Sequence, residues 1–401
     1  MNILVLRPGH QKLTFSYFSN GWDQPLCAGQ MEDYRTGEGS QQALHEITEA
    51  LRQNRATHPA GTPLRTEHPT PAGSVSSGES SGQPVLPDVI ALRGIFGGTE
   101  FKEPTLVSPK VLRKLEKLVE NAPLHIPALL ALIQACQAAF VNTPIVLIFE
   151  TAFFADLPER EHLYAVDPRL SKTRGVRRFG YHGILHAAAC NHVARKRREM
   201  GHDSAARVLS ICLEARPEVA AVLGQKPLLV TSGGTPLEGL PGQTTCGELD
   251  PGIVLMLAQK KGWGPEQLNA VLTQQSGWLG LVGRITTLAE IFGSHRPECE
   301  LAKEIIQYRL LQVCGAGMAA LGGVDAIVFS GRCSGVGAGL GVWLKKKLDF
   351  QQQGSLNPIL IEICPETVDR VLAETACTAL LGSKLAPRRK HGQVPINPAA
   401  S

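Results

Sequence analysis

The order of apolar and polar residues along the chain predicts short buried strands that alternate with amphipathic helices. Residues 2–18 read NILVLRPGHQKLTFSYF, two apolar runs around a Pro-Gly pair, which predicts a strand, a tight turn and a returning strand. A second hairpin is expected at 207–230. Further strands are expected at 89–95, 144–150, 322–332 and 358–363, and helices at 41–54, 109–121, 127–140, 181–200, 251–261, 265–275, 301–320, 335–349 and 366–380. Two hairpins, each followed by helices and buried strands, predict a duplicated α/β unit of two similar lobes with a cleft between them.

The length of 401 residues also favours two domains. Residues 55–88 are rich in Pro, Gly, Ser and Thr and contain little to bury, which is typical of a low-complexity surface insertion. We therefore expect an N-terminal lobe at 1–150 that carries this insertion, a C-terminal lobe at 151–383, and a Pro/Arg-rich tail at 384–401.

Composition narrows the classes of protein that fit. The net charge of +4 is too small to argue for nucleic-acid binding, and the basic run at 194–199 is typical of a solvated helix end. None of the ten cysteines forms a CxxC pair, so a zinc site or a disulfide framework is not expected. Without an apolar run of ~18 residues, the sequence predicts no membrane segment and a cytoplasmic location.

Several longer motifs carry a family resemblance. GVRRFGYHGILH at 175–186 is very close to G-I-R-R-Y-G-F-H-G-T-S-H, and TPLEGLPGQTTCGELDPGIV at 235–254 matches T-P-L-E-G-L-x-x-G-T-R-x-G-D-x-D-P-G. APLHIP, ETAFF and ALGGVDAIVFSG follow the same collinear order. On these motifs the chain resembles the acetate kinase family. The resemblance implies the two-lobed actin-like, sugar-kinase-like ATPase fold of duplicated ribonuclease-H-like domains.

The resemblance also implies an activity: ATP and a short-chain carboxylate give an acyl phosphate and ADP, with Mg²⁺ as cofactor. It further implies a homodimer formed through the second lobe. Arg93, Glu150 and His182 match the family's catalytic positions, and His125 and His186 match two further family histidines. An arginine fork suits a carboxylate or phosphoryl group, and an imidazole can donate to a developing oxyanion.

The nucleotide side departs from the family pattern. The opening hairpin carries Arg7 and Lys12 where the family has N-A-G-S-S-S-x-K, and we expect these cations to bind phosphate or substrate. The second phosphate loop, H-L-G-N-G-A-S in the family, is CLEARPE here, so Glu214 and Arg216 replace glycines. Thr245 stands where the family has an active-site arginine.

Three assignments rest on weaker signals. Gly331 and Gly335, in the turn after the strand at 322–332, are expected to contact the nucleotide. Glu366 or Asp369 matches the family's metal-holding acid in an uncertain register.

Two functions fit this pattern. The first is a working carboxylate kinase with a substituted nucleotide-phosphate site and reduced activity, in which Arg7, Lys12 and Arg216 supply the charge missing at Thr245. The alternative is a catalytically inactive pseudokinase that binds a protein or a small anion.

Overall fold

The computed structural model describes residues 1–9, 12–19, 24–57, 86–169, 175–348 and 358–385. Most of the insertion expected at 55–88, and the tail from residue 386 onward, therefore lie outside the described residues. Residues 55–57 complete a helix, which extends the element expected at 41–54 in both directions.

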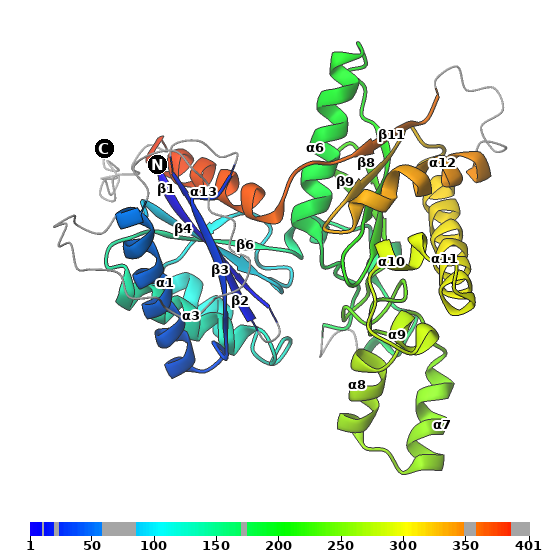
Figure 1. Ribbon diagram of the computed structural model, residues 1–401, viewed down its shortest axis with the longest axis horizontal. Helices are drawn as coiled ribbons and strands as arrows, with labels where there is room; N and C mark the ends of the chain where they lie inside the picture. The colour runs from blue at the N-terminus through cyan, green and yellow to red at the C-terminus, as the bar shows by residue number, and fades with distance from the viewer. Residues whose placement is uncertain (10–11, 20–23, 58–85, 170–174, 349–357, 386–401) are drawn as a thin grey trace, which may run out of the picture.

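A six-stranded sheet forms the core of the first lobe (Figure 1). Its strand order is β3-β2-β1-β4-β6-β5. Strands β1, β2 and β3 form an antiparallel meander, and β4 and β6 continue the sheet in parallel. The expected opening hairpin is confirmed, whereas β3 and the short β5 were not expected. The strands are β1 (Asn2–Pro8), β2 (Lys12–Ser19), β3 (Cys27–Glu32), β4 (Val89–Gly94), β5 (Thr105–Leu106) and β6 (Ile145–Phe149).

The sheet of the second lobe repeats this plan. Its order is β11-β10-β7-β8-β9. Strands β7, β8 and β9 again form an antiparallel meander, while β10 and β11 are parallel to β7. The strands are β7 (Arg207–Cys212), β8 (Glu218–Leu223), β9 (Lys226–Val230), β10 (Ala326–Ser330) and β11 (Leu360–Ile363). The same meander followed by parallel strands in both lobes shows the duplication that the sequence pattern predicts.

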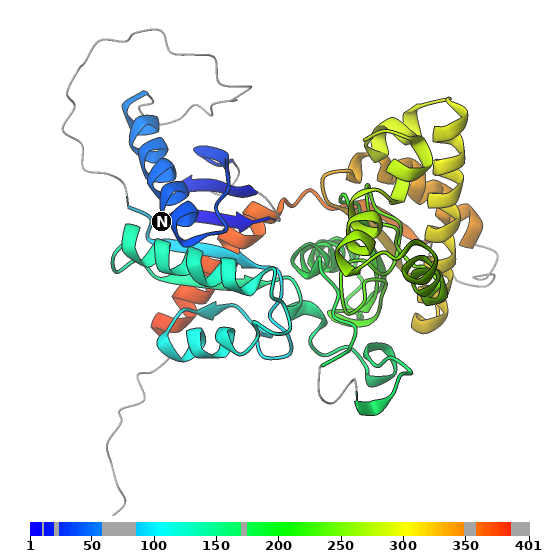
Figure 2. The ribbon, with the colours of Figure 1, turned by 90° about the horizontal axis from the view of Figure 1, so that it is seen from below.

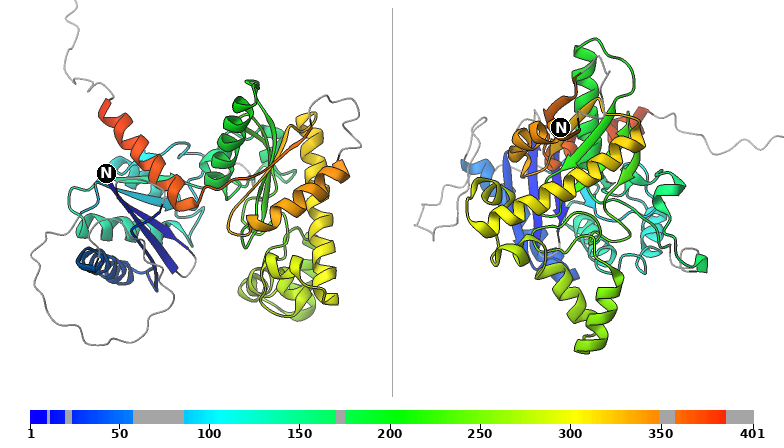
Figure 3. Two further views of the ribbon diagram at one scale, coloured as in Figure 1. Left: turned by 45° about the horizontal axis from the view of Figure 1, so that its top comes forward. Right: turned by 90° about the vertical axis from the view of Figure 1, so that its right-hand side faces the viewer.

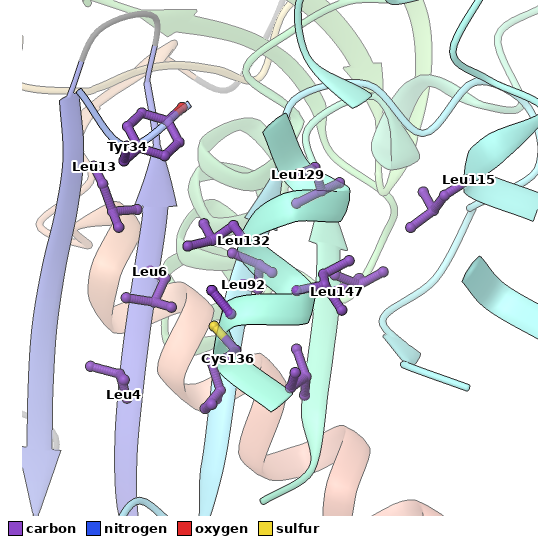
Figure 4. Close-up of a cluster of buried hydrophobic side chains, with 14 of the residues drawn as sticks. Leu4, Leu6, Leu13, Tyr34, Leu92, Leu115, Leu129, Leu132, Cys136 and Leu147 are labelled. Atoms are coloured by element: carbon purple, nitrogen blue, oxygen red, sulfur yellow. The ribbon is translucent and has the colours of Figure 1, made fainter. Parts of the chain in front are cut away.

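Strand β1 is apolar in consecutive positions because both faces of its sheet are covered. Leu4 and Leu6 point to one side, where they pack with residues of α1 (Gly37–Thr57) and α3 (Ile126–Ala139) (Figure 4). Ile3 and Val5 point to the opposite side. The alternation of side chains along a strand accounts for this division.

The helix that covers this opposite face comes from the far end of the chain. In α13 (Val368–Leu385), Leu372, Ala373 and Ala376 are fully buried in one cluster with Ile3 and Val5. The segment from β11 to α13 passes from one lobe to the other (Figures 2 and 3). We expected residues 151–383 to form the second lobe together. Instead α13 packs on the first sheet, because an apolar helix face does not specify which sheet it covers.

Helices also cover both faces of the second sheet. Residues of α6 (Gly183–Glu199) pack on one face, and α11 (Pro297–Leu321) and α12 (Gly337–Leu348) pack on the other. A helical pair, α7 (Pro251–Lys261) and α8 (Pro265–Gln274), projects from this lobe and contains no buried residue (Figure 1). The remaining helical elements are α2 (Pro109–Glu116), η1 (Ala152–Phe154), α4 (Glu159–His162), α9 (Gly277–Val282), α10 (Leu288–Gly293) and η2 (Ser334–Val336).

Across the described part of the chain, no helix combines the length and the apolar character needed to cross a membrane.

Candidate active site

Arg93 and Glu150 form an ion pair where two parallel strands of the first sheet end. Arg93 lies in β4 and Glu150 directly follows β6, and Arg93 Nε lies 2.6 Å from Glu150 Oε1. The Glu150 side chain is 2% exposed, and its second oxygen accepts the backbone N–H of Ile184 at 3.1 Å. The carboxylate thus neutralises the arginine and caps the first turn of α6.

Glu218, at the start of β8, joins the beginning of α6 to the second sheet. Its side chain is fully buried. One oxygen accepts the backbone N–H of Tyr181 at 2.9 Å, and the other accepts that of His182 at 2.9 Å. The Nε2 atom of His186 lies 3.3 Å from Glu218 Oε1, while its Nδ1 lies 2.8 Å from the Ser210 hydroxyl. These contacts fix the FGYHG segment against the second sheet.

The charge of Glu218 is held in place by these donors. Burial alone raises the pKa of a carboxyl group, but the His186 hydrogen bond and the nearby His182 and His186 rings outweigh it and hold the pKa at about 2. Glu218 is therefore ionised at neutral pH. It is a site residue that we did not identify from the sequence; the only signal was an acid at the first position of an apolar strand.

His182 lies at the N-cap of α6, between the Arg93–Glu150 pair and the second lobe. Its Nε2 lies 3.0 Å from the carbonyl oxygen of Arg216, and because a carbonyl only accepts, Nε2 carries the proton. Burial lowers the pKa of the imidazole, against the opposing effect of the Glu218 and Glu150 carboxylates. His182 is accordingly neutral near pH 7, with Nδ1 left as its second polar atom.

Arg216, in the turn between β7 and β8, lies close to Arg93. Its side chain keeps accessible surface. Burial of its guanidinium among neighbouring atoms lowers its pKa, and the Arg93 charge lowers it further, against smaller raising effects of Tyr181 and Glu218. Among the described residues, the Arg216 guanidinium makes no ion pair and no hydrogen bond. Two arginines from different lobes therefore share one region, and within the part of the chain that the structure describes Arg93 is the one of the two that is paired with an acid.

The side chains of Arg216 and Thr245 both lie next to the backbone of Gly242. A Cβ added at Gly242 would meet Thr245 Oγ1 at 2.3 Å and Arg216 Cγ at 3.1 Å. Thr245 is buried, and its hydroxyl lies on the same side of Gly242 as the Arg216 stem.

Other predicted cations are already paired. Arg7 forms an ion pair with Asp369, which also accepts a hydrogen bond from the Ser16 hydroxyl at 2.9 Å. Lys12 pairs with Glu32 across the β2–β3 ladder at 2.8 Å, with both side chains about half exposed. No described contact brings Lys12 to the Arg93–Glu150 pair.

The acids at this site do not form a metal centre by themselves. Glu150 is bound to Arg93, Asp369 to Arg7, and Glu366 lies 3.3 Å from Arg370. No group of three His, Cys, Asp or Glu side chains capable of holding a metal occurs within the residues the structure describes. The described residues therefore supply no three-ligand metal centre, and a magnesium ion here would take most of its ligands from nucleotide phosphates and water; the role of Glu366 as a ligand stays a prediction.

One hollow lies beside Arg93 in the first lobe, and a second lies in the second lobe. A small one of about 10 Å³, next to Arg93, is lined by His125, Tyr34 and Phe96. A much larger cavity of about 930 Å³ lies in the second lobe, with Arg332, Cys333 and Gly335 at one side. The other lining residues are Ala215, Gln243, Trp278, Thr287, Leu288, Ala289, Phe292, Gly293, Lys303, Gln307, Val336, Gly339 and Leu340.

Of the predicted nucleotide glycines, Gly335 lines the large cavity, and Gly331 directly precedes Arg332, which also lines it. Gly331 has a φ of +89° at the end of β10, and a Cβ there would meet the Leu213 carbonyl oxygen at 2.9 Å. Gly335 lines the cavity, and nothing lies within 4 Å of where its Cβ would be. The first glycine is thus required by the turn, and the second leaves the cavity wall open.

Solved structures define the class of fold. The acetate kinase of Porphyromonas gingivalis superposes with a TM-score of 0.77 at 23% identity, covering 94% of this chain and 99% of the other. A propionate kinase from Francisella tularensis gives 0.76 at 23% identity, with the same coverage. The protein therefore has the two-lobed α/β fold of these kinases.

Sequence comparison identifies the family. Residues 85–341 match the acetokinase family. The acetate kinase of Helicobacter acinonychis is 32% identical over 82% of both chains, and that of Leifsonia xyli is 31% identical over 84% of this chain and 82% of its own. The chain belongs to the acetokinase family, as its motifs predict.

Proposed function

We propose that the protein transfers a phosphoryl group from Mg·ATP to a short-chain carboxylate, giving an acyl phosphate and ADP. Family membership supports a carboxylate kinase. The observation that carries the proposal is the position of Arg216 beside Arg93, without an acid partner among the described residues. An unneutralised cation next to a paired arginine suits an anionic substrate and a phosphoryl group in transfer.

In this proposal the carboxylate oxygen attacks the γ-phosphorus while the bond from phosphorus to the ADP oxygen breaks, and ADP leaves with that electron pair. Arg93, held by Glu150, orients the acceptor carboxylate. Arg216 stabilises negative charge on the transferring group. His182, fixed through its backbone N–H by Glu218, places an imidazole beside both arginines. The chain's contribution is positioning and electrostatics, which is what phosphoryl transfer requires.

Arg216 also compensates for Thr245 in this proposal. The two side chains flank Gly242, so a cation lost at one position is supplied from the neighbouring loop. The nucleotide-phosphate site is nevertheless substituted, because Glu214 and Arg216 replace residues that would let backbone amides approach phosphates. We therefore propose a lower turnover than a family member with glycines at these positions would have.

The test is acyl phosphate formation, trapped with hydroxylamine, from Mg·ATP and acetate. Arg216→Ala should lower kcat by about 10²-fold, the usual cost of removing one donor to a developing oxyanion. Arg216→Ala/Thr245→Arg should recover at least tenfold of that loss. Arg309→Ala, which removes an exposed arginine on α11, is the matched control and should leave kcat unchanged. Full activity in Arg216→Ala would contradict the role of Arg216.

One observation favours the second candidate, a non-catalytic family member. Arg7 and Lys12, which were expected to supply positive charge, form ion pairs with Asp369 and Glu32. A wild-type protein that makes no acyl phosphate and shows no thermal shift with millimolar Mg·ATP would establish this candidate and reject the first.

We also propose a homodimer formed through the second lobe. Helices α7 and α8 contain no buried residue, and Ile253, Leu255 and Met256 are exposed on α7. Analytical ultracentrifugation should give twice the chain mass, and Leu255→Glu should shift the equilibrium to the monomer. A monomeric wild-type protein at micromolar concentration would reject this assembly.

A further inference from the structure

The Glu214 carboxylate accepts hydrogen bonds from two donors of Arg332 at the edge of the large cavity. Its Oε1 accepts the backbone N–H of Arg332 at 2.8 Å, and its Oε2 accepts Nε of the same residue at 2.6 Å. The Glu214 side chain is only 14% exposed, whereas that of Arg332 is 76% exposed. The carboxylate is therefore directed inward, onto the turn between β10 and α12.

The contact between Glu214 and Arg332 lies at the wall of the large cavity. Arg332 lines the cavity, and so does Ala215, the residue after Glu214. Gly331 brings the turn close to Glu214, since a Cβ there would lie 3.2 Å from Oε1. The carboxylate thus lies beside the part of the cavity wall that Ala215 and Arg332 form.

The two donors that hold this carboxylate would hold a phosphate oxygen equally well. A backbone N–H and a guanidinium bind anionic acceptors through the same charge-assisted hydrogen bonds. A carboxylate and a phosphate cannot share them, because like charges a few ångströms apart repel strongly at a partly buried site. Of the two hydrogen bonds, the one from the exposed Arg332 guanidinium is the easier to break, since exposed ion pairs contribute little to stability.

We propose that the Glu214 carboxylate takes the place of a ligand phosphate at Arg332. An uncharged nucleoside then binds the cavity while Glu214 stays in place. A nucleotide binds only when Glu214 leaves Arg332. The inference rests on the proposed function in one respect, namely that the cavity holds the nucleoside part of ATP. It adds that the phosphates bring little affinity, because each polyphosphate must displace a carboxylate of this chain.

The experiment compares adenosine and Mg·ATP by isothermal titration calorimetry at fixed ionic strength. In the wild type, the two dissociation constants should agree within about threefold. Glu214→Ala, which empties the position, should bind Mg·ATP at least tenfold more tightly and leave adenosine binding within twofold. Glu214→Gln keeps the shape and removes the charge, so it should give an intermediate gain.

Glu116→Gln is the matched control, because it removes one exposed acid on α2, away from the cavity lining, and should change neither constant. If turnover is present but Mg·ATP affinity is the same in the wild type and both Glu214 variants, the inference alone is overturned. If no variant binds adenosine or Mg·ATP, the inference and the proposed function are both overturned. Should Glu214→Ala fail to fold, Glu214→Gln decides the question by the same comparison.

Discussion

Glu218 offers a direct test of the electrostatics that hold the FGYHG segment. The carboxyl group has a pKa of about 2 in the folded protein against 4.5 for a free side chain. Each pKa unit corresponds to about 1.4 kcal/mol, so the ionised form stabilises the fold by on the order of 3 kcal/mol. Glu218→Gln keeps the size but replaces one acceptor oxygen with a donor that faces the backbone N–H groups of Tyr181 and His182.

We expect Glu218→Gln to lower the free energy of unfolding of the second lobe by on the order of 3 kcal/mol at pH 7. Because the folded pKa is depressed, this contribution is complete above pH 4.5 and is lost as the pH falls toward 2. The difference between wild type and variant should therefore narrow on acidification. Urea unfolding followed by tryptophan fluorescence, from pH 7 down to pH 3.5, measures it.

The control for this series is Glu116→Gln, an exposed acid on α2 whose replacement should cost less than about 0.5 kcal/mol at any pH. Two results would refute the reasoning. One is a Glu218→Gln protein as stable as the wild type at pH 7. The other is a stability difference that stays constant across the pH range, which would assign the loss to shape and not to charge.

Three further predictions follow from the site. The His182 imidazole should titrate below its ordinary value of 6.5 in ¹H–¹⁵N NMR spectra, since burial lowers its pKa, and a midpoint above 6.5 would contradict this. Gly331→Ala should destabilise the protein by about 1–3 kcal/mol in thermal unfolding, because the φ of +89° and the Leu213 carbonyl both oppose a side chain; an unchanged midpoint would rule out a strained turn. Arg93→Met should cost about 3 kcal/mol by leaving the Glu150 carboxylate buried without its partner, and Arg93→Met/Glu150→Leu should recover part of the loss; equal stability of the two variants would argue against the pair.

The sequence was informative wherever a feature lies within one contiguous stretch. Strands covered on both faces give uninterrupted apolar runs, so β1, β4 and β6 were found at nearly their observed bounds. The motif around His182 is long enough to identify the family. The collinear motifs then assigned Arg93 and Glu150 to the same catalytic site as His182. The structure brings these three residues into one region through the ion pair and the first turn of α6.

Features made by distant segments could not be read in the same way. Glu218 looks like an ordinary polar strand end until the Tyr181 and His182 amides are placed against it. The pairing of Glu214 with Arg332 depends on how two loops of the second sheet meet, and hydrophobic periodicity carries no information about that. Strand β3 was missed because its residues alternate between partly and fully exposed positions and lack a continuous apolar run.

The return of α13 to the first sheet has a consequence for how the protein is made. The face of that sheet formed by Ile3, Val5 and Val89 is covered by Leu372 and Ala376, which leave the ribosome long after the strands of that sheet. The first lobe therefore cannot complete its core until residues 368–385 have been made, although its own strands emerge first. Nascent chains must keep this apolar face protected until α13 arrives, and fragments that stop before residue 368 should depend on chaperones to remain in solution.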